Sequence, residues 1–203
     1  MVVQTKLSIL DILDLNIEGV HLRKLTQEVH GSFPNVRRFV NLLVDEGIVK
    51  TEQKGNLLNI KLKDSFSTLA YLKFVHTSRF LSLPDYLVQG IRDCLQDLEY
   101  KPLICLIVGD SKELKDKLKK SEAIEILFVF QDLEKNKNQK IKKSIKDSIE
   151  KTKLKIKPNI LDYNEFKNKF IDKSDKFFNN LISRNIIITG IDYYYSLLWR
   201  FLK

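Results

Sequence analysis

The sequence is poor in the residue types that build disulfides, metal sites and membrane spans. Its two cysteines, Cys94 and Cys105, lie in apolar segments without the spacing of metal ligands, so we expect buried, reduced thiols in a cytoplasmic protein. No apolar run approaches the roughly 18–20 residues that cross a membrane, so we expect no membrane partner. The first ten residues lack a basic segment followed by a long apolar stretch, and we expect no signal peptide.

Histidine is also scarce. His21, His30 and His76 are scattered along the chain and form neither a metal-ligand pattern nor a set suited to a catalytic triad. We therefore expect no metal and no cofactor. Hydrophobic residues make up 43% of the 203 residues and charged residues 30%, which is typical of a globular protein. The length suffices for one large domain or two small ones.

Positive charge, in contrast, is abundant and unevenly distributed. The formal net charge of +9 indicates a polyanionic partner. Residues 1–64 hold 9 Lys and Arg against 8 Asp and Glu, whereas residues 134–157 hold 10 lysines against 3 acids. DNA binding by the N-terminal part therefore depends on where individual side chains lie. We interpret the lysines of 135–157 as a solvated helix face, with a second phosphate-contacting surface as the alternative.

The N-terminal third predicts three short helices followed by a β-hairpin. Apolar residues recur at helical spacing in the helical segments, and they run continuously or alternate in the strands. Ser32 is placed to cap the third helix, Pro34 falls in its first turn, and Gly47 ends it. The expected elements are helices over 6–15, 22–29 and 32–46, strands over 48–52 and 57–63, and a turn at 53–56.

The outer face of the third helix carries side chains suited to reading base edges. Arginine bonds guanine through two hydrogen bonds, and asparagine does the same to adenine. A phenylalanine at the helix start suits a thymine methyl group, and hairpin lysines would reach phosphates or a minor groove. The alternative for each residue alone is a solvated helix face. The candidate DNA-binding residues are Ser32, Phe33, Asn35, Arg37, Arg38, Asn41, Lys50 and Lys54.

Residues 32–49 resemble the recognition helix and wing entry of the winged helix-turn-helix transcription regulators common in archaea and bacteria. The shared pattern is a small polar cap, a proline or polar residue, an arginine-bearing helix, and then Leu-x-x-x-Gly-hydrophobic-Val, here Leu43 to Val49. The resemblance covers residues 6–63 and implies binding to double-stranded DNA. A winged helix that contacts protein is the alternative.

The rest of the chain predicts a pair of helices and then a small mixed-sheet α/β domain. The helical segment 65–100 is broken near Ser82–Pro84, and the continuous apolar runs that follow are typical of strands buried on both faces. The expected strands cover 103–108, 124–130, 154–161 and 186–189, and the later helices cover 135–151, 163–183 and 192–202. We therefore predict an α+β protein with a winged helix at 1–64, connecting helices at 65–100 and a second domain at 101–203.

The order of elements over 103–130 resembles the minimal nucleotidyltransferases of the polymerase-beta type. Those enzymes carry a Gly-Ser turn that holds phosphates, and an Asp-x-Asp pair that binds two metal ions. Here Gly109, Asp110 and Ser111 form the turn, and Ala123 and Glu125 stand where the two aspartates would be. The resemblance therefore implies a degenerate, catalytically inactive domain. The final strand and the helix with Tyr193–Tyr195, which we expect in the core, also resemble that family; an unrelated α/β domain is the alternative.

These expectations combine into one hypothesis. The chain is expected to be a cytoplasmic, homodimeric transcription regulator that binds double-stranded DNA, with the helices of 65–100 as the dimer contact and with a pseudoenzyme domain. Two alternatives stay open. One is an active, metal-dependent nucleotidyltransferase with an appended winged helix, and the other is a winged-helix scaffold that binds protein.

Overall fold

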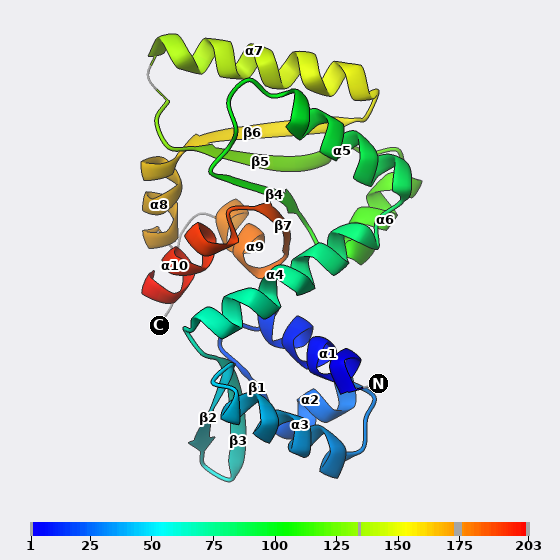
Figure 1. Cartoon of the computed structure of the whole chain (residues 1–203), viewed down its shortest axis with the longest axis vertical. Coiled ribbons are helices and arrows are strands. Elements are labelled where there is room, and N and C mark those ends of the chain that lie inside the picture. The colour runs from blue at the N-terminus through cyan, green and yellow to red at the C-terminus, as the bar shows by residue number, and fades with distance from the viewer. Residues whose placement is uncertain (1, 134, 173–175, 202–203) are drawn as a thin grey trace. The chain divides into compact units, whose positions relative to one another are not determined.

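The computed structural model describes residues 2–133, 135–172 and 176–201 of the chain (Figure 1). The chain divides into two compact units, Met1–Val75 and His76–Lys203. Each unit combines helices with a small β-sheet, which confirms the α+β class. Within the described ranges, no helix has the length and apolar character that a membrane crossing requires.

The first unit follows the predicted order, with one additional strand. Helices α1 and α2 precede α3, and a β-hairpin follows it (Figure 1). The three strands pair antiparallel in the order β1-β3-β2. The elements are α1 (Val2–Asp14), β1 (Val20–His21), α2 (Leu22–Glu28), α3 (Phe33–Asp45), β2 (Val49–Lys54) and β3 (Leu57–Leu62), and α4 (Phe66–Leu81) begins in this unit.

The core of the first unit lies between the helices and the sheet. The predicted apolar face of α3 is buried throughout, and α1 and α2 pack against this helix. Gly47 adopts a φ of +70°, which glycine tolerates best, and the backbone N–H of Ile48 then bonds the carbonyl of Leu43 at 2.9 Å. This turn ends α3 and leads the chain into the hairpin.

Three local details of the first unit differ from the sequence-based expectations. The two-residue strand β1 was not predicted, because its apolar pattern is too short to be recognised. Ser32 occupies the cap position of α3 in extended conformation, but its side chain makes no cap hydrogen bond. Strand β2 extends to Lys54, so the loop of the hairpin is only Gly55 and Asn56.

The second unit is built around a four-stranded mixed sheet. The strand order is β6-β5-β4-β7, in which β5 and β6 are parallel and the other pairs are antiparallel. The elements are α5 (Asp85–Asp97), β4 (Ile104–Val108), α6 (Ser111–Lys119), β5 (Ile124–Phe130), α7 (Lys135–Thr152), β6 (Ile156–Asp162), α8 (Tyr163–Ile171), α9 (Lys176–Ser183), β7 (Asn185–Thr189) and α10 (Ile191–Phe201).

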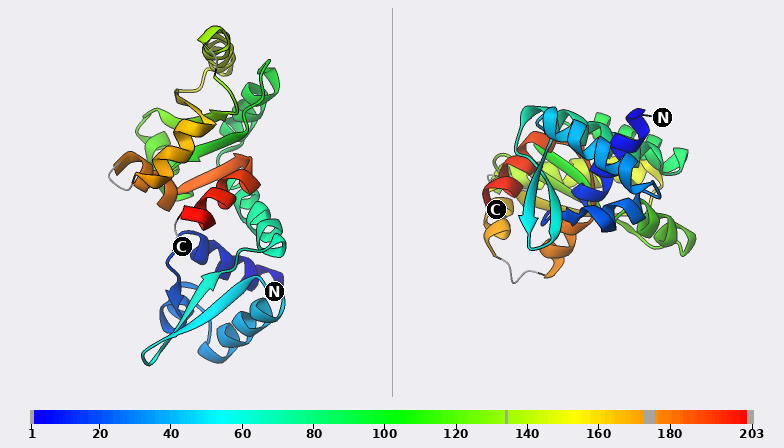
Figure 2. Two further views of the ribbon diagram at one scale, coloured as in Figure 1. Left: turned by 90° about the vertical axis from the view of Figure 1, so that its left-hand side faces the viewer. Right: turned by 90° about the horizontal axis from the view of Figure 1, so that it is seen from below.

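Helices cover both faces of this sheet, as Figure 2 shows. Cys105, Ile107 and Phe128 share one core cluster with apolar residues of α5, α6 and α7. On the other face α10 packs against β4 and α8 packs against β5. Strand β4 is apolar along its whole length and β5 is apolar apart from Glu125, because both faces of these central strands are buried, as the apolar runs predicted.

The Phe-rich segment 163–183 forms two helices instead of the single predicted helix. Helix α8 ends at Asp172, whose backbone is extended, and α9 begins at Lys176. The polar run from Asp172 to Lys176 interrupts the apolar periodicity, and this interruption was overlooked. The aromatic side chains of both helices still meet, since the rings of Phe170 and Phe178 lie 4.9 Å apart at 80°.

The cysteines and the C-terminal tyrosines largely follow the predictions. Cys94 and Cys105 are free and buried, and burial raises the pKa of the Cys94 thiol to about 11 and raises the pKa of Cys105 further. Both thiols therefore remain protonated and unreactive at neutral pH. Tyr194 and Tyr195 lie in the core, whereas Tyr193 is exposed.

Helix α4 runs across the division between the two units. Its first turns belong to the first unit, where the Thr68 hydroxyl donates to the carbonyl of Ile48 at 3.0 Å. Its later residues belong to the second unit, where buried His76 lies 3.0 Å from the Tyr195 hydroxyl and accepts a 3.1 Å hydrogen bond from the Ile187 backbone. Helix α5 lies wholly in the second unit and packs against α7.

Candidate nucleic-acid interface

Helix α3 separates its apolar and polar side chains onto opposite faces. Val36, Val40 and Leu43 are fully buried. The predicted reading residues, Asn35, Arg37, Arg38 and Asn41, are all exposed. A helix that is fixed along one face and exposes arginine and asparagine along the other meets the requirement for insertion into a major groove.

The two arginines of α3 differ in their surroundings. Arg38 donates a hydrogen bond from Nη2 to Asn35 Oδ1 at 3.2 Å, and its guanidinium carbon lies 4.9 Å from the centre of the Phe39 ring. These contacts hold Arg38 and Asn35 as an oriented pair of donors. Arg37 forms no hydrogen bond or ion pair with any residue in the described part of the chain. The helix therefore presents one oriented and one free guanidinium.

The start of α3 exposes further predicted contact residues. Ser32 precedes the helix, and its hydroxyl makes no hydrogen bond to the first turn. Phe33, the first residue of the helix, is 41% exposed although it is aromatic. The exposed ring of Phe33 offers an apolar contact, and the neighbouring Ser32 hydroxyl offers a hydrogen bond. Both residues thus lie where the sequence-based hypothesis requires them.

The hairpin presents less free positive charge than the sequence suggested. Lys50 Nζ lies 2.9 Å from Glu52 Oε1, and Lys61 Nζ lies 3.4 Å from Glu52 Oε2. The hydrogen bond from Lys50 is the main cause that holds the pKa of Glu52 below its usual value. These ion pairs lie at the surface, with Lys50 exposed and Glu52 and Lys61 half-buried, so a phosphate can compete for the lysines. The side chain of Lys54 lies outside the described residues.

In the second unit, Asp110 occupies the turn where the resemblance expects a phosphate. Gly109 has a φ of +111°, and Asp110 Oδ1 accepts hydrogen bonds from the backbone N–H groups of Lys112 and Glu113, both at 2.9 Å. These are amides at the start of α6, which would otherwise face an anion. The carboxylate of Asp110 therefore fills the anion position of this turn. The neighbouring Ser111 hydroxyl accepts from Ser82 at 3.4 Å.

The remaining carboxylate of the degenerate motif is already paired. Glu125 Oε1 lies 2.9 Å from Lys157 Nζ, and the two residues are direct partners in the parallel pairing of β5 and β6. Ala123 is exposed just before β5 and supplies no ligand. A lysine beside Glu125 repels a divalent cation. The sequence did not reveal the pairing of Glu125 with Lys157, because it depends on the register of β5 and β6.

Searches against protein families, curated proteins and solved structures found no match to this chain.

The turn and the start of β5 lie together because β4 and β5 are antiparallel, with Ile107 opposite Ile126. Beside them is a cavity of about 390 Å³. Four acidic and four basic side chains line it: Asp110, Glu113, Asp116, Glu122, Lys112, Lys117, Lys120 and Arg184. The lining has no net charge to attract the phosphates of a nucleotide. Within the described ranges, no group of three or more His, Cys, Asp or Glu residues is placed to hold a metal ion.

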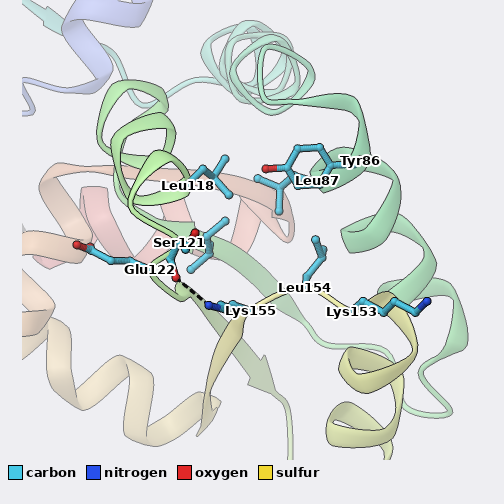
Figure 3. Close-up of a pocket in the computed structure, with 9 residues that line it drawn as sticks. Tyr86, Leu87, Leu118, Ser121, Glu122, Lys153, Leu154 and Lys155 are labelled. Atoms are coloured by element: carbon cyan, nitrogen blue, oxygen red, sulfur yellow. Dashed lines mark hydrogen bonds between the residues drawn. The ribbon is translucent and has the colours of Figure 1, made fainter.

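A second cavity of about 180 Å³ lies between α5, α6 and the start of β6 (Figure 3). Its apolar walls are formed by Leu87, Leu118, Leu154 and the ring of Tyr86, and its polar walls by Ser121, Glu122, Lys153 and Lys155. Lys155 Nζ donates a hydrogen bond to the backbone carbonyl of Ser121 at 3.3 Å. Because its lining offers no buried, unpaired polar group to orient a ligand, we assign this cavity no ligand.

Proposed function

We propose that this chain is a DNA-binding transcription regulator whose first unit is a winged helix. The observation that carries the proposal is the exposed face of α3, where Asn35, Arg37, Arg38 and Asn41 lie opposite a fully buried apolar face. In this proposal α3 enters the major groove and its arginines and asparagines bond base edges. The hairpin of β2 and β3 follows the helix directly and contacts the backbone through its lysines.

We further propose that the second unit is a catalytically inactive, nucleotidyltransferase-like domain. Two-metal phosphoryl transfer needs carboxylates that hold both ions about 3.5–4 Å apart. Support comes from Asp110, which caps α6, and from Glu125, which is paired to Lys157. We expect no transfer of AMP, GMP, CMP or UMP with Mg²⁺ or Mn²⁺. Label transfer from an α-³²P nucleotide that disappears in Glu125→Ala, but persists in Glu122→Ala, would establish the rival enzyme.

We propose that the regulator acts as a homodimer through α4. One winged helix reads only a short half-site, and a two-fold pair reads two. Support comes from the exposed face of α4, where Phe66 is 87% exposed and Phe74 is 55% exposed. These residues are eight apart and lie on the same side of the helix, with exposed Ala70 between them. A second copy of the same surface would bury both rings in an isologous contact.

The decisive experiment is selection of bound sequences from random double-stranded DNA by the full chain. The proposal predicts an enriched motif, and its affinity should fall steeply with salt. Arg92 is an exposed arginine on α5 and serves as the control site. Loss of the motif in an Arg37→Ala/Arg38→Ala variant but not in Arg92→Ala supports the reading role of α3. Recovery of no motif, together with salt-independent DNA binding, would favour the protein-binding scaffold.

A further inference from the structure

The positive charge of the second unit is concentrated in one helix and the strand that follows it. Residues 135–157 contain 10 lysines and 2 acids, whereas the rest of His76–Lys203 contains 15 basic and 16 acidic residues. All of the excess positive charge of this unit therefore lies on α7 and the start of β6. In the left view of Figure 2, α7 is seen almost end-on at the outer margin of the unit.

Helix α7 is held by a narrow apolar stripe and exposes the rest of its surface. Ile141, Ile145 and Ile149 are buried against α5 and the sheet. The exposed face carries lysines at positions 140, 142, 143 and 146. Several of these are three or four residues apart, which places like charges side by side and destabilises an isolated helix.

Only some of these lysines have a partner in the fold. Lys146 lies 3.8 Å from Glu150, and Lys151 lies 2.9 Å from Asp97. By contrast, the side chains of a second group of exposed lysines form no hydrogen bond or ion pair with the described residues. This group consists of Lys140, Lys142, Lys143 and Lys153. These four residues form what we call the α7 lysine surface.

We propose that the α7 lysine surface binds the phosphate backbone of double-stranded DNA without sequence preference; the choice of DNA as the polyanion rests on the proposed function of the first unit. Lysine suits this role, because its ammonium is a point charge on a flexible stem and needs no fixed geometry. Duplex DNA carries one negative charge per roughly 1.7 Å of its axis, so a cluster of free lysines meets several phosphates at once.

The composition of α7 favours a nucleic acid over a membrane surface. A helix that lies in a membrane interface exposes apolar residues beside its basic ones. The isoleucines of α7 are instead buried in the core, and the exposed face offers no large apolar side chain within the described ranges. The exposed face of α7 can therefore attract a partner by charge alone, which suits a densely charged, soluble polyanion.

The test measures binding of the full chain to a random-sequence duplex over a range of salt concentrations. The test variant is Lys140→Gln/Lys142→Gln/Lys143→Gln, because glutamine keeps helix propensity and removes charge. The matched control, Lys112→Gln/Lys115→Gln/Lys120→Gln, removes the same charge from α6 and its C-cap residue, where acids lie among the lysines. We expect the α7 variant to lose at least tenfold in affinity at low salt, and the slope of log affinity against log salt to fall by about 2–3.

The outcomes distinguish this inference from the proposed function. Wild-type affinity and salt slope in the α7 variant would overturn the inference, and so would an equal loss in the α6 control. Binding of wild-type protein to phosphatidylserine vesicles, without any effect of the α7 variant on DNA, would also overturn it. Failure of the proposed function appears elsewhere, as an Arg37→Ala/Arg38→Ala variant that keeps any selected motif. Circular dichroism confirms that each variant is folded.

Discussion

Helices α3 and α7 are both exposed and basic, but they hold their charge in different ways. In α3 the charge is carried by arginine among asparagines, and Arg38 is oriented by Asn35 and by the ring of Phe39. In α7 it is carried by lysines, several of which have no side-chain partner among the described residues. Oriented donors discriminate between bases, whereas free ammonium groups only neutralise phosphates. The comparison teaches that, under the proposed function, sequence-specific and unspecific contacts to DNA use different chemistry.

The largest expected effect is on the free energy of unfolding, after removal of a buried side chain that anchors each helix to its unit. Ile145→Ala in α7 and Leu43→Ala in α3 each remove a buried side chain, and each should lower the free energy of unfolding of its unit by about 2–5 kcal/mol. Lys146→Ala, next to Ile145 but exposed, should change it by less than about 0.5 kcal/mol. Trp199, the single tryptophan, lies in the second unit, so urea unfolding followed by its fluorescence reports Ile145→Ala separately from Leu43→Ala.

Next in size is the effect of replacing the oriented arginine. Arg38→Ala should weaken binding to a selected site by roughly 1–3 kcal/mol if Arg38 bonds a base edge. Arg38→Lys keeps the charge but loses the planar pair of donors, so it should lose specificity while keeping affinity for random DNA. Fluorescence anisotropy with both duplexes measures the two effects. If Arg38→Lys and wild type bound the selected site with equal affinity, the proposed difference between the oriented arginine of α3 and the free lysines of α7 would be wrong.

A smaller effect is expected at the proposed dimer contact. Phe74→Glu places a charge where two copies of α4 would meet, and it should raise the dimer dissociation constant at least tenfold, or about 1.4 kcal/mol. Tyr86→Glu is a matched control, since Tyr86 is 59% exposed on α5 and Phe74 is 55% exposed on α4. Sedimentation equilibrium over a range of concentrations measures both. A wild-type protein that stays monomeric at tens of micromolar, with and without DNA, contradicts the dimer.

The smallest expected effect tests whether the hairpin lysines are held back by their acidic partner. Glu52→Gln releases Lys50 and Lys61, so affinity for DNA should rise a few-fold at low salt and the gain should disappear at high salt. Because its pKa is lowered, Glu52 is charged at neutral pH, and the pairing is lost as pH falls through that pKa. Wild type and variant should therefore converge in acid. Glu28→Gln, which frees Lys24 on α2, is the control.

The repeating patterns of the sequence predicted most elements, and the irregular ones were overlooked. The buried strands Ile104–Val108 and Ile124–Phe130 and the apolar stripe of α7 followed from continuous or periodic apolar residues. Strand β1 has two residues and offers no period to read. The break between α8 and α9 lies in a polar run that interrupts a pattern otherwise typical of one helix.

At the candidate sites, the sequence likewise predicted which residues share a helix face but not which side chains pair across strands. That Arg37 and Arg38 lie on the outer face of α3 follows from the helical period. The pairing of Lys50 with Glu52 and of Glu125 with Lys157 depends on strand register and side-chain direction, which local sequence does not determine. The buried contact of His76 with Tyr195 joins residues more than a hundred positions apart, so no local pattern reveals it.

The position of Asp110 has a consequence for anion binding at the start of α6. Its carboxylate is a covalently tethered anion, and tethering gives a group an effective concentration in the millimolar range even on a short flexible linker. A phosphate that approaches the start of α6 must therefore displace the Asp110 carboxylate, which is covalently attached and cannot diffuse away. Under the proposed nucleotidyltransferase-like assignment, a metal ligand introduced at Ala123 alone would leave this carboxylate in place. A nucleotide site at this turn would also require that α6 lose its own cap.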